Sequence, residues 1–324
     1  MSDPGCSTKD IGLQDEAQAW LARLASGSAT AADLGALNAW RDRSMEHRRA
    51  FAEAALLWNL LGDATRQAVA EERPAVAGTL MQRRAFIGGG LMAASLTGAA
   101  AAVHPPLGLW PSWAELAAEY RTHKGERRQI EIGGTTAVQI NTQTSIDLRP
   151  ATDDGVVRVD LIAGEAAFTS QKPRTHDIIV HAGSGRAGGR DAAFNVRRDG
   201  NTVSIFCVKG DVLVTCDAGT SMLGDGQQIL FNELGMRQVA AIDPEVMTAW
   251  QRGLLIFRDE ALSRVIEEVN RYRFGKIVLL DNKLGQRRIV ANFRLDRIED
   301  VVDFVADVVR VPVRRLPGGI VLLG

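Results

Sequence analysis

Apolar residues recur at helical spacing over about the first sixty residues of the chain. Ala17, Trp20, Leu21 and Leu24 follow i, i+3, i+4, i+7 spacing, which places them on one face of a helix. Two further apolar stripes follow and contain Leu34, Leu37, Trp40, and then Met45, Ala50, Phe51, Ala54, Leu57, Trp58. We therefore predict a small all-α domain over residues 1–63. A domain of this size has little core, so its three tryptophans are either that core or anchors for a partner helix.

An uncharged run rich in Ala and Gly occupies residues 85–106, after a linker at 64–84. Its length is close to the roughly 20 residues that a helix needs to cross the hydrocarbon core. We predict one transmembrane helix here; the alternative is a buried core helix. Arg83 and Arg84 precede the run, and no Lys or Arg follows it until Arg121. The positive-inside rule then keeps the first eighty or so residues in the cytoplasm and exports the rest of the chain. The arginine pair also resembles a twin-arginine export signal, and cleavage of the run as a signal stays open.

From Tyr120 to about Val239 the apolar period changes to two. Short strands recur about every ten residues between Gly, Asp and Asn, which is typical of an all-β sandwich or a solenoid-like domain. We predict this domain over 120–240. The expected strands are Arg128–Ile132, Ala137–Asn141, Ser145–Leu148, Val156–Leu161, Asp177–Val180, Ala193–Val196, Val203–Val208 and Val212–Val214.

The last part of the chain, 250–324, mixes both periods. Leu254–Phe257 reads as a strand, and an amphipathic helix with Leu262, Val265, Ile266, Val269 and Tyr272 on its apolar face follows. Further strands are expected at Ile277–Leu280, Ile289–Phe293, Val311–Arg315 and Ile320–Leu323, with a second helix at Ile298–Val308. The order β-α-β-β-α-β-β predicts an α+β module in which two helices pack on one small sheet.

Charge and motif content exclude several classes of function. The net charge is −1 and no long basic run occurs, which argues against a nucleic-acid interface. There is no HExxH, no Cys/His ligand cluster, no G-x-S-x-G and no P-loop, so we predict no enzyme, cofactor or metal site. Gly183–Gly188 matches G-x-G-x-x-G, but a strand follows in place of the required helix, which indicates a glycine-rich turn. Cys207 and Cys216 form either one bridge or two free thiols.

Several segments in this order resemble the FecR family of transmembrane anti-σ regulators. The helical stripe with Trp20, Trp40 and Trp58 resembles the σ-binding domain of that family. The segments that resemble its periplasmic β domain are Gly125–Arg128, Gln139–Thr142, Leu161–Phe168 and Val208–Val212. Trp250–Phe257 and Asn270–Tyr272 resemble its C-terminal part, which is similar to the signalling (STN) modules of secretins and TonB-dependent receptors.

The resemblance implies a single-pass protein of the bacterial inner membrane, with its N-terminus in the cytoplasm and its C-terminus in the periplasm. It also implies a relay with three kinds of partner. An extracytoplasmic-function σ factor binds the helical domain in the cytoplasm. The signalling domain of a TonB-dependent outer-membrane receptor, importing a siderophore or haem, contacts the periplasmic part. Proteases then cut the chain and free the σ factor. Which signal, which σ factor, and whether the helical domain also activates σ stay open.

Specific residues are expected to take these roles. The σ-contacting residues are Trp20, Leu21, Arg23, Leu24, Trp40, Phe51 and Trp58. A receptor strand is expected to pair with a sheet edge formed by Val311–Arg315 or Ile320–Leu323, because chain-terminal strands often lie at sheet edges. The receptor-contacting residues are then Val311, Val313, Ile320 and Leu322. Arg83 and Arg84 direct export and topology.

One position departs from the family. Many members carry Gly-Thr before a Phe-x-Val strand, and some break their own chain there when the Thr hydroxyl attacks the preceding carbonyl. Here Asp191 and Ala192 precede Phe194-Asn195-Val196. Alanine carries no nucleophile, so we predict an intact chain before any protease acts.

The predicted fold is multi-domain: an all-α cytoplasmic domain, one transmembrane helix, an all-β periplasmic domain and an STN-like α+β module. The alternative function is that of a twin-arginine-exported periplasmic binding or cell-wall protein without a σ partner. In that alternative the N-terminal residues are only a leader peptide. The three tryptophans argue against it, because they lie at helical spacing with other apolar residues.

Overall fold

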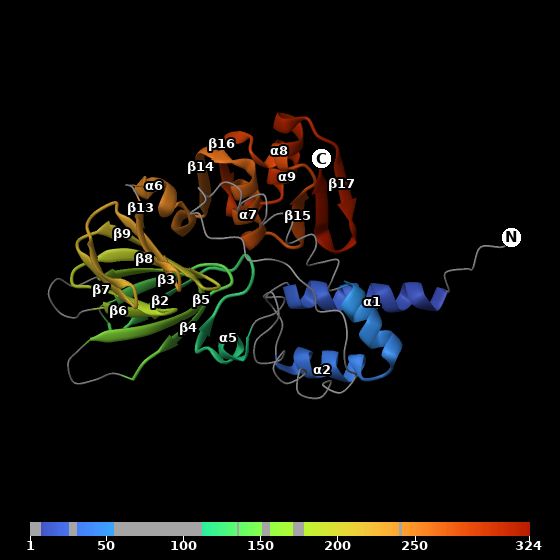
Figure 1. Cartoon of the computed structure of the whole chain (residues 1–324), viewed down its shortest axis with the longest axis horizontal. Coiled ribbons are helices and arrows are strands. Elements are labelled where there is room, and N and C mark those ends of the chain that lie inside the picture. Colours follow the sequence, from blue (N-terminus) through green and yellow to red (C-terminus); the bar gives the residue numbers. More distant parts are fainter. Residues whose placement is uncertain are drawn as a thin grey trace, which may run out of the picture.

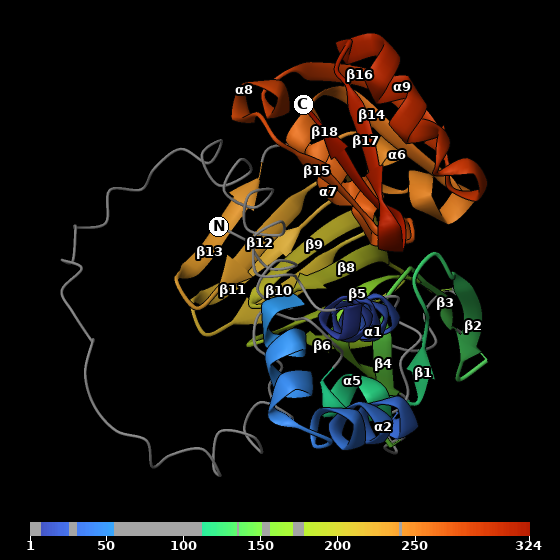
Figure 2. The same ribbon diagram turned by 90° about the vertical axis from the view of Figure 1, so that its right-hand side faces the viewer.

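The computed structural model describes residues 8–25, 31–54, 112–134, 136–150, 156–170, 178–239 and 242–324. They form three parts, coloured blue, green to yellow, and orange to red in Figure 1. These parts are a helical module near the N-terminus, a β domain, and a C-terminal module of helices and short strands. The β domain and the C-terminal module lie against each other in both views (Figures 1 and 2).

The helical module consists of α1 (Thr8–Ala25), α2 (Ala31–Arg41) and a helical segment at 45–54. Arg23 of α1 pairs with Asp33 of α2 at 2.8 Å. The apolar faces of the three helices meet in one small core, formed by Ala17, Leu21, Leu24, Leu37, Trp40, Ala50, Phe51 and Ala54. The apolar stripes in the sequence are thus the packing faces of these helices.

The predicted fold class is wrong in its transmembrane helix. Within the described ranges, no helix is both long and apolar enough to cross a membrane. The longest of them, α1, has 18 residues but carries charged side chains such as Lys9, Asp10 and Arg23. Each charge at the bilayer centre would cost about 3 kcal/mol.

The segments on which the membrane prediction was based lie outside the described residues. They are the linker at 64–84, Arg83, Arg84 and the run at 85–106. The expected location at a bacterial inner membrane stays a prediction.

The β domain is one 13-stranded sheet preceded by the short helix α5 (Trp113–Ala117). The end-to-end strand order is β11-β10-β7-β6-β5-β8-β9-β12-β13, and β1 to β4 pair with one another or with β5. The strands are β1 (Tyr120–Arg121), β2 (Arg128–Ile132), β3 (Thr136–Ile140), β4 (Ser145–Leu148), β5 (Val157–Ser170), β6 (Ile178–Ala182), β7 (Gly185–Gly189), β8 (Ala193–Asp199), β9 (Thr202–Lys209), β10 (Val212–Cys216), β11 (Gly219–Leu223), β12 (Gln228–Asn232) and β13 (Gly235–Val239).

The long strand β5 belongs to both halves of this sheet. Its first half, 157–161, pairs with β6, whereas its second half, 164–169, pairs with β8. The change occurs next to Gly164, whose φ is +89°. A Cβ at this position would lie 2.5 Å from the backbone oxygen of Gln143, so only glycine fits there. The two halves consequently fold face to face and enclose one core, in which Phe168 and Phe194 stack with ring centroids 5.6 Å apart.

Two open questions from the sequence are settled in the β domain. The Gly183–Gly188 pattern is a turn at Gly183 followed by strand β7, where Gly185 leaves room for the ring of Phe231 on the opposite half. Cys207 on β9 and Cys216 on β10 are free thiols. Burial and the nearby Asp225 and Asp211 carboxylates raise the pKa of Cys207 to about 11.

The C-terminal module contains two small sheets, where one was predicted. One sheet pairs β14 (Leu254–Ala261) with β16 (Arg288–Arg294), and the other has the order β15-β18-β17. Helix α7 has the predicted apolar face, with Leu262, Val265, Ile266, Val269 and Tyr272 all buried. The remaining elements are α6 (Pro244–Met247), η2 (Ala249–Arg252), α7 (Leu262–Tyr272), β15 (Lys276–Leu279), α8 (Asn282–Gly285), η3 (Leu295–Arg297), α9 (Asp300–Val309), β17 (Val313–Leu316), η4 (Pro317–Gly319) and β18 (Ile320–Leu323).

Candidate functional site

The helical module buries most of the residues that were expected to contact a σ factor. Leu21, Leu24, Trp40 and Phe51 all lie in its core. Trp20 is half-buried against that core, and Arg23 is exposed beside Asp33. Trp58 lies outside the described residues. Of the two interpretations of the tryptophans, as core residues or as anchors for a partner helix, the structure supports the first for Trp40.

Contacts with α1 and with the segment 45–54 hold Trp40 in this core. Its indole Nε1 donates a hydrogen bond to Oε2 of Glu16 at 2.6 Å. The imidazole of His47 meets its ring edge-on, with centroids 4.9 Å apart, and the Ser44 hydroxyl lies 2.8 Å from Nδ1 of that imidazole. Trp40 thus joins α1, α2 and the segment 45–54, and its side chain is not offered to a partner.

Met45, in contrast to Trp40, is exposed to solvent. The sequence placed it in the third apolar stripe, yet 73% of its surface is exposed. Arg48 and Arg49, on the same helical segment, are also exposed. An exposed methionine next to arginines is a frequent composition of protein-binding surfaces. We call Met45, Arg48 and Arg49 the Met45 surface.

A second candidate site joins the β domain to the C-terminal module. Three segments that lie far apart in the sequence converge there: Asn141 follows β3, Glu165 lies in the second half of β5, and Arg271 and Tyr272 end α7. We call this cluster, together with Arg197 of β8 and Glu268 of α7, the junction.

Glu165 is the centre of the junction, with only 5% of its side chain exposed. Its Oε2 accepts hydrogen bonds from Arg271 Nη1 and from Asn141 Nδ2, each at 2.9 Å. Its Oε1 accepts one from Asn195 Nδ2 at 2.9 Å. A buried carboxylate with this many donors is fully paired, which is the condition for a buried charge to be tolerated.

Charge alternates outward from this carboxylate across the two domains. Arg271 Nη1 also lies 2.6 Å from Glu268 Oε1, and Glu268 Oε2 lies 2.7 Å from Arg197 Nη1 of the β domain. Asn141 Nδ2 in turn donates to the Tyr272 hydroxyl at 2.7 Å. The chain of contacts therefore crosses from β5 to α7 and returns to β8, so that separating the domains would leave several buried charges unpaired.

The electrostatics of the junction follow from this alternation. Burial by itself would raise the pKa of Glu268, but Arg197 and Arg271 outweigh it and lower the pKa to about 2. Burial opposes the charge on Arg271 as well, yet Glu268 and Glu165 raise the pKa of its guanidinium. Burial raises the pKa of the Tyr272 hydroxyl. Glu268 and Arg271 are thus held charged and the Tyr272 phenol neutral.

Contacts to backbone carbonyls complete the junction on its outer side. Arg127 Nη1 donates to the Trp250 carbonyl at 2.7 Å, and Thr142 Oγ1 donates to the Arg271 carbonyl at 3.1 Å. Lys124 Nζ lies 3.4 Å from the Gly275 carbonyl. Burial, and then the nearby cations Lys276 and Arg273, lower the pKa of Lys124 to about 8. The loops of the β domain thereby contact the C-terminal module at two places, at Trp250 before β14 and at Arg271 and Gly275 around the end of α7.

The stability of the junction should depend on pH through Glu268. Its pKa in the folded state, about 2, lies below its ordinary value of 4.5. The carboxylate therefore stabilises the fold fully above about pH 4.5, and this contribution is lost as the pH falls from about 4.5 toward 2. We expect the urea midpoint of unfolding to fall across that window, and to fall less steeply in Glu268→Gln. Parallel profiles for the two proteins would contradict this prediction.

The predicted receptor-contacting residues are divided between an edge and a central strand. β17 pairs only with β18 among the described strands and forms an edge that includes Val313. β18 lies between β15 and β17, so Ile320 and Leu322 are not on an edge. The expectation that Ile320–Leu323 forms a sheet edge is wrong, because the parallel pairing of β15 with β18 places this strand in the centre. Contact of these residues with a receptor stays a prediction.

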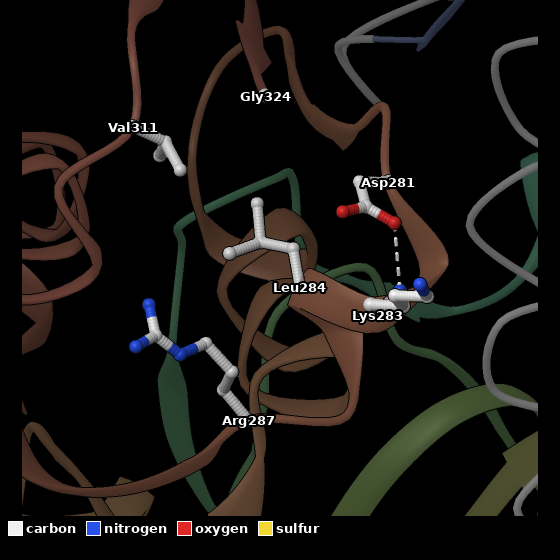
Figure 3. A pocket seen from close by; sticks show the side chains of 6 residues that line it. All are labelled: Asp281, Lys283, Leu284, Arg287, Val311 and Gly324. Atoms are coloured by element: carbon white, nitrogen blue, oxygen red, sulfur yellow. Dashed lines mark hydrogen bonds between the residues drawn. The ribbon is translucent and has the colours of Figure 1, made fainter.

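Val311 lies at a shallow pocket of about 390 Å³ beside this sheet (Figure 3). The other lining residues are Asp281, Lys283, Leu284, Arg287 and Gly324. Asp281 Oδ1 accepts the backbone N–H of Lys283 and Arg287 Nη1 donates to the Val309 carbonyl, so two of the polar groups are occupied by the fold itself. Within the described residues, no group of His, Cys, Asp or Glu is arranged to hold a metal ion.

Asn141, Glu165, Arg271 and Tyr272 lie in segments that resemble the FecR family, but the sequence indicated no functional role for them. The available signal was a polar side chain beside the apolar positions of each segment. That signal does not indicate a partner, because Glu165 and Arg271 are 106 residues apart in the chain.

Comparison with known proteins identifies two parts of the chain. Residues 118–213 match the model of the FecR protein family, and residues 15–57 match a domain of unknown function, DUF4880. No curated protein matches the chain. Two crystal structures of a candidate anti-sigma factor from Parabacteroides distasonis, at 1.65 and 2.50 Å resolution, share the fold, with TM-scores of 0.54 and 0.53. Each is 22% identical and covers 63% of this chain, and the matches span 97% and 96% of those chains.

Proposed function

We propose that this chain, which carries a FecR domain behind a DUF4880 region, regulates an extracytoplasmic-function σ factor. The order of these two regions along one chain carries the proposal. The fold shared with a candidate anti-sigma factor supports it. The helical module binds the σ factor, and the β domain with the C-terminal module receives the signal.

The Met45 surface is the part of the helical module best suited to hold the σ factor. Leu21, Leu24, Trp40 and Phe51 shape this surface from beneath by fixing the three helices, but they do not form it. An exposed apolar side chain with flanking guanidinium groups can bury its area at the centre of an interface while the arginines form its rim.

Co-purification tests this assignment on the full chain. We expect the tagged protein to retain an extracytoplasmic-function σ factor encoded beside it, and Met45→Asp to reduce that retention. Leu234→Asp is the matched control, because Leu234 is also exposed but lies in the turn between β12 and β13. Equal retention by wild type and Met45→Asp would overturn the assignment of this surface. Failure of wild-type protein to retain a σ factor would overturn the proposed function.

The signal enters through the free edge of β17 in this proposal. The signalling domain of a TonB-dependent receptor adds a strand there, whose backbone hydrogen bonds supply affinity. Arg314 and Arg315 are exposed on β17, so an acidic receptor strand is favoured. The rigid junction then transmits the contact to the β domain.

Charge reversal on β17 should weaken receptor binding. We expect Arg314→Glu to reduce the affinity for the isolated receptor signalling domain by about tenfold, since one attractive charge becomes repulsive. Arg288→Glu is the control, because Arg288 is an exposed arginine on β16 of the other sheet. Titration calorimetry measures both. An equal loss in the two variants would show that the effect is not specific to β17.

Release of the σ factor depends on proteases in this scheme and not on self-cleavage. Asp191 has a φ of +53°, in the left-handed region that aspartate enters more readily than most residues with a side chain. Ala192 beside it is buried and has no nucleophile. We expect the purified chain to remain one band on a denaturing gel after days of incubation. Two fragments with a new N-terminus at Ala192 would contradict this expectation.

A further inference from the structure

The edge strand β11 (Gly219–Leu223) is unusual in having no charged residue. It lies at one end of the 13-stranded sheet and pairs only with β10 among the described strands. Other edge strands carry charges, such as Arg314 on β17, Arg237 on β13 and Arg288 on β16. Proteins commonly protect sheet edges from further pairing by charges, prolines or bulges. β11 has none of these, and its pairing with β10 is regular over all five residues.

One row of the outer face next to this edge is apolar, whereas the next row contains Thr220, Thr215 and the exposed Arg186. Met222 of β11 lies directly across from Leu213 of β10, and both are exposed, by 56% and 45%. The same row continues through Gly188 of β7 to Ile179 of β6. A strand that pairs with β11 would place one of its side chains next to Met222. An apolar side chain there would extend the row formed by Met222, Leu213, Gly188 and Ile179.

The charges within the β10–β11 hairpin itself are all of one sign. The hairpin at 211–225 contains Asp211, Asp217 and Asp225 and no Lys, Arg or His. Asp217 lies in the turn at one end of the hairpin, and Asp211 and Asp225 lie at the other. Pairing of β11 with β11 of a second copy would bring aspartates together in either orientation, which is repulsive.

We propose that β11 is a docking edge for an extended strand of a partner protein, apolar at its centre and basic at both ends. The backbone N–H and C=O groups of β11 supply the pairing, Met222 and Leu213 supply the apolar contact, and the aspartates at both ends select the basic residues. This edge is separate from β17 and from the Met45 surface, and it does not depend on the proposed function.

A peptide probe tests the proposal with the full chain. The probe is a fluorescently labelled nine-residue peptide of alternating valine and threonine with a lysine at each end. We expect saturable binding by fluorescence anisotropy, and slower hydrogen exchange in β11 on mass spectrometry. A probe with N-methyl groups on alternate residues cannot pair through one edge, and a probe with glutamate ends meets the aspartates. We expect each to bind at least about tenfold more weakly.

Variants locate the contact. Met222→Lys should weaken binding of the lysine-ended probe by about tenfold or more, because it removes the apolar contact and adds a like charge. Val290→Lys changes a residue that is 75% exposed on β16 of the C-terminal module, so probe binding by this variant should equal that of the wild type. Both positions are exposed, and an unchanged urea midpoint confirms folding. Absence of binding up to millimolar probe, protection at β13 or β17 in place of β11, or equal losses in both variants would overturn the proposal.

Discussion

Replacement of Glu165 by alanine should lower the free energy of unfolding by about 3–5 kcal/mol. The substitution leaves the buried Arg271 guanidinium with one carboxylate partner, Glu268, in place of two, and it removes the acceptor for the Asn141 and Asn195 amides. The loss of partners for buried polar groups, and not the small loss of volume, causes most of this effect. Urea unfolding followed by tryptophan fluorescence measures it, because Trp250 lies at the junction.

Asp160→Ala is the matched control for Glu165→Ala. Asp160 also pairs with an arginine, Arg149, at 2.7 Å, but both side chains are substantially exposed. An exposed pair of this kind contributes at most about 1 kcal/mol. Glu165→Gln should fall between the two, because the amide keeps the shape and one acceptor. Equal stability of Glu165→Ala and Asp160→Ala would show that the junction does not hold the two domains together.

If the junction transmits a signal, its loss should leave receptor binding intact and weaken the σ-dependent transcriptional response. We expect Glu165→Ala to bind the receptor domain through β17 almost as well as the wild type, since β17 is not part of the junction. The σ-dependent reporter should respond less, because the C-terminal module no longer moves with the β domain.

Replacement of Trp40 by alanine should unfold the helical module and abolish retention of the σ factor. A buried tryptophan reduced to alanine typically costs about 3–5 kcal/mol. The core that contains Trp40 is small, and a domain of so few residues has little stability to lose. The expected loss of σ binding is therefore a consequence of unfolding and not of a lost contact. Far-ultraviolet circular dichroism of the isolated residues 1–63, beside co-purification with the full chain, measures both effects.

Met45→Asp separates these two explanations. Because Met45 is exposed, its replacement should leave the helical signal unchanged while σ retention falls. Trp40→Phe, which keeps most of the volume but loses the hydrogen bond to Glu16, should retain both the fold and the σ factor at reduced stability. A Trp40→Ala variant that stays folded and fails to bind would instead place Trp40 in the contact.

The sequence by itself determined the elements whose pattern is local. The five apolar residues predicted for α7 are the buried face of that helix. Strands β2 and β4 have the predicted bounds, Arg128–Ile132 and Ser145–Leu148. Periods of 3.6 and 2 arise from the geometry of one helix or one strand, so they can be recognised without knowledge of the partner. The FecR model at 118–213 and the DUF4880 model at 15–57 confirm the family resemblance for the β domain and the helical module.

Only the tertiary structure decided which faces are covered and which residues meet. Trp40 and Met45 both fit apolar stripes, yet one is buried and the other exposed, because the packing of three short helices leaves part of a stripe without a neighbour. β18 became a central strand through parallel pairing with β15, which no local pattern specifies. Glu165 and Arg271 meet across 106 residues because β5 changes from one half of the sheet to the other at Gly164. Contacts between such distant positions depend on how whole elements pack, and a pattern read along the chain contains no information about that packing.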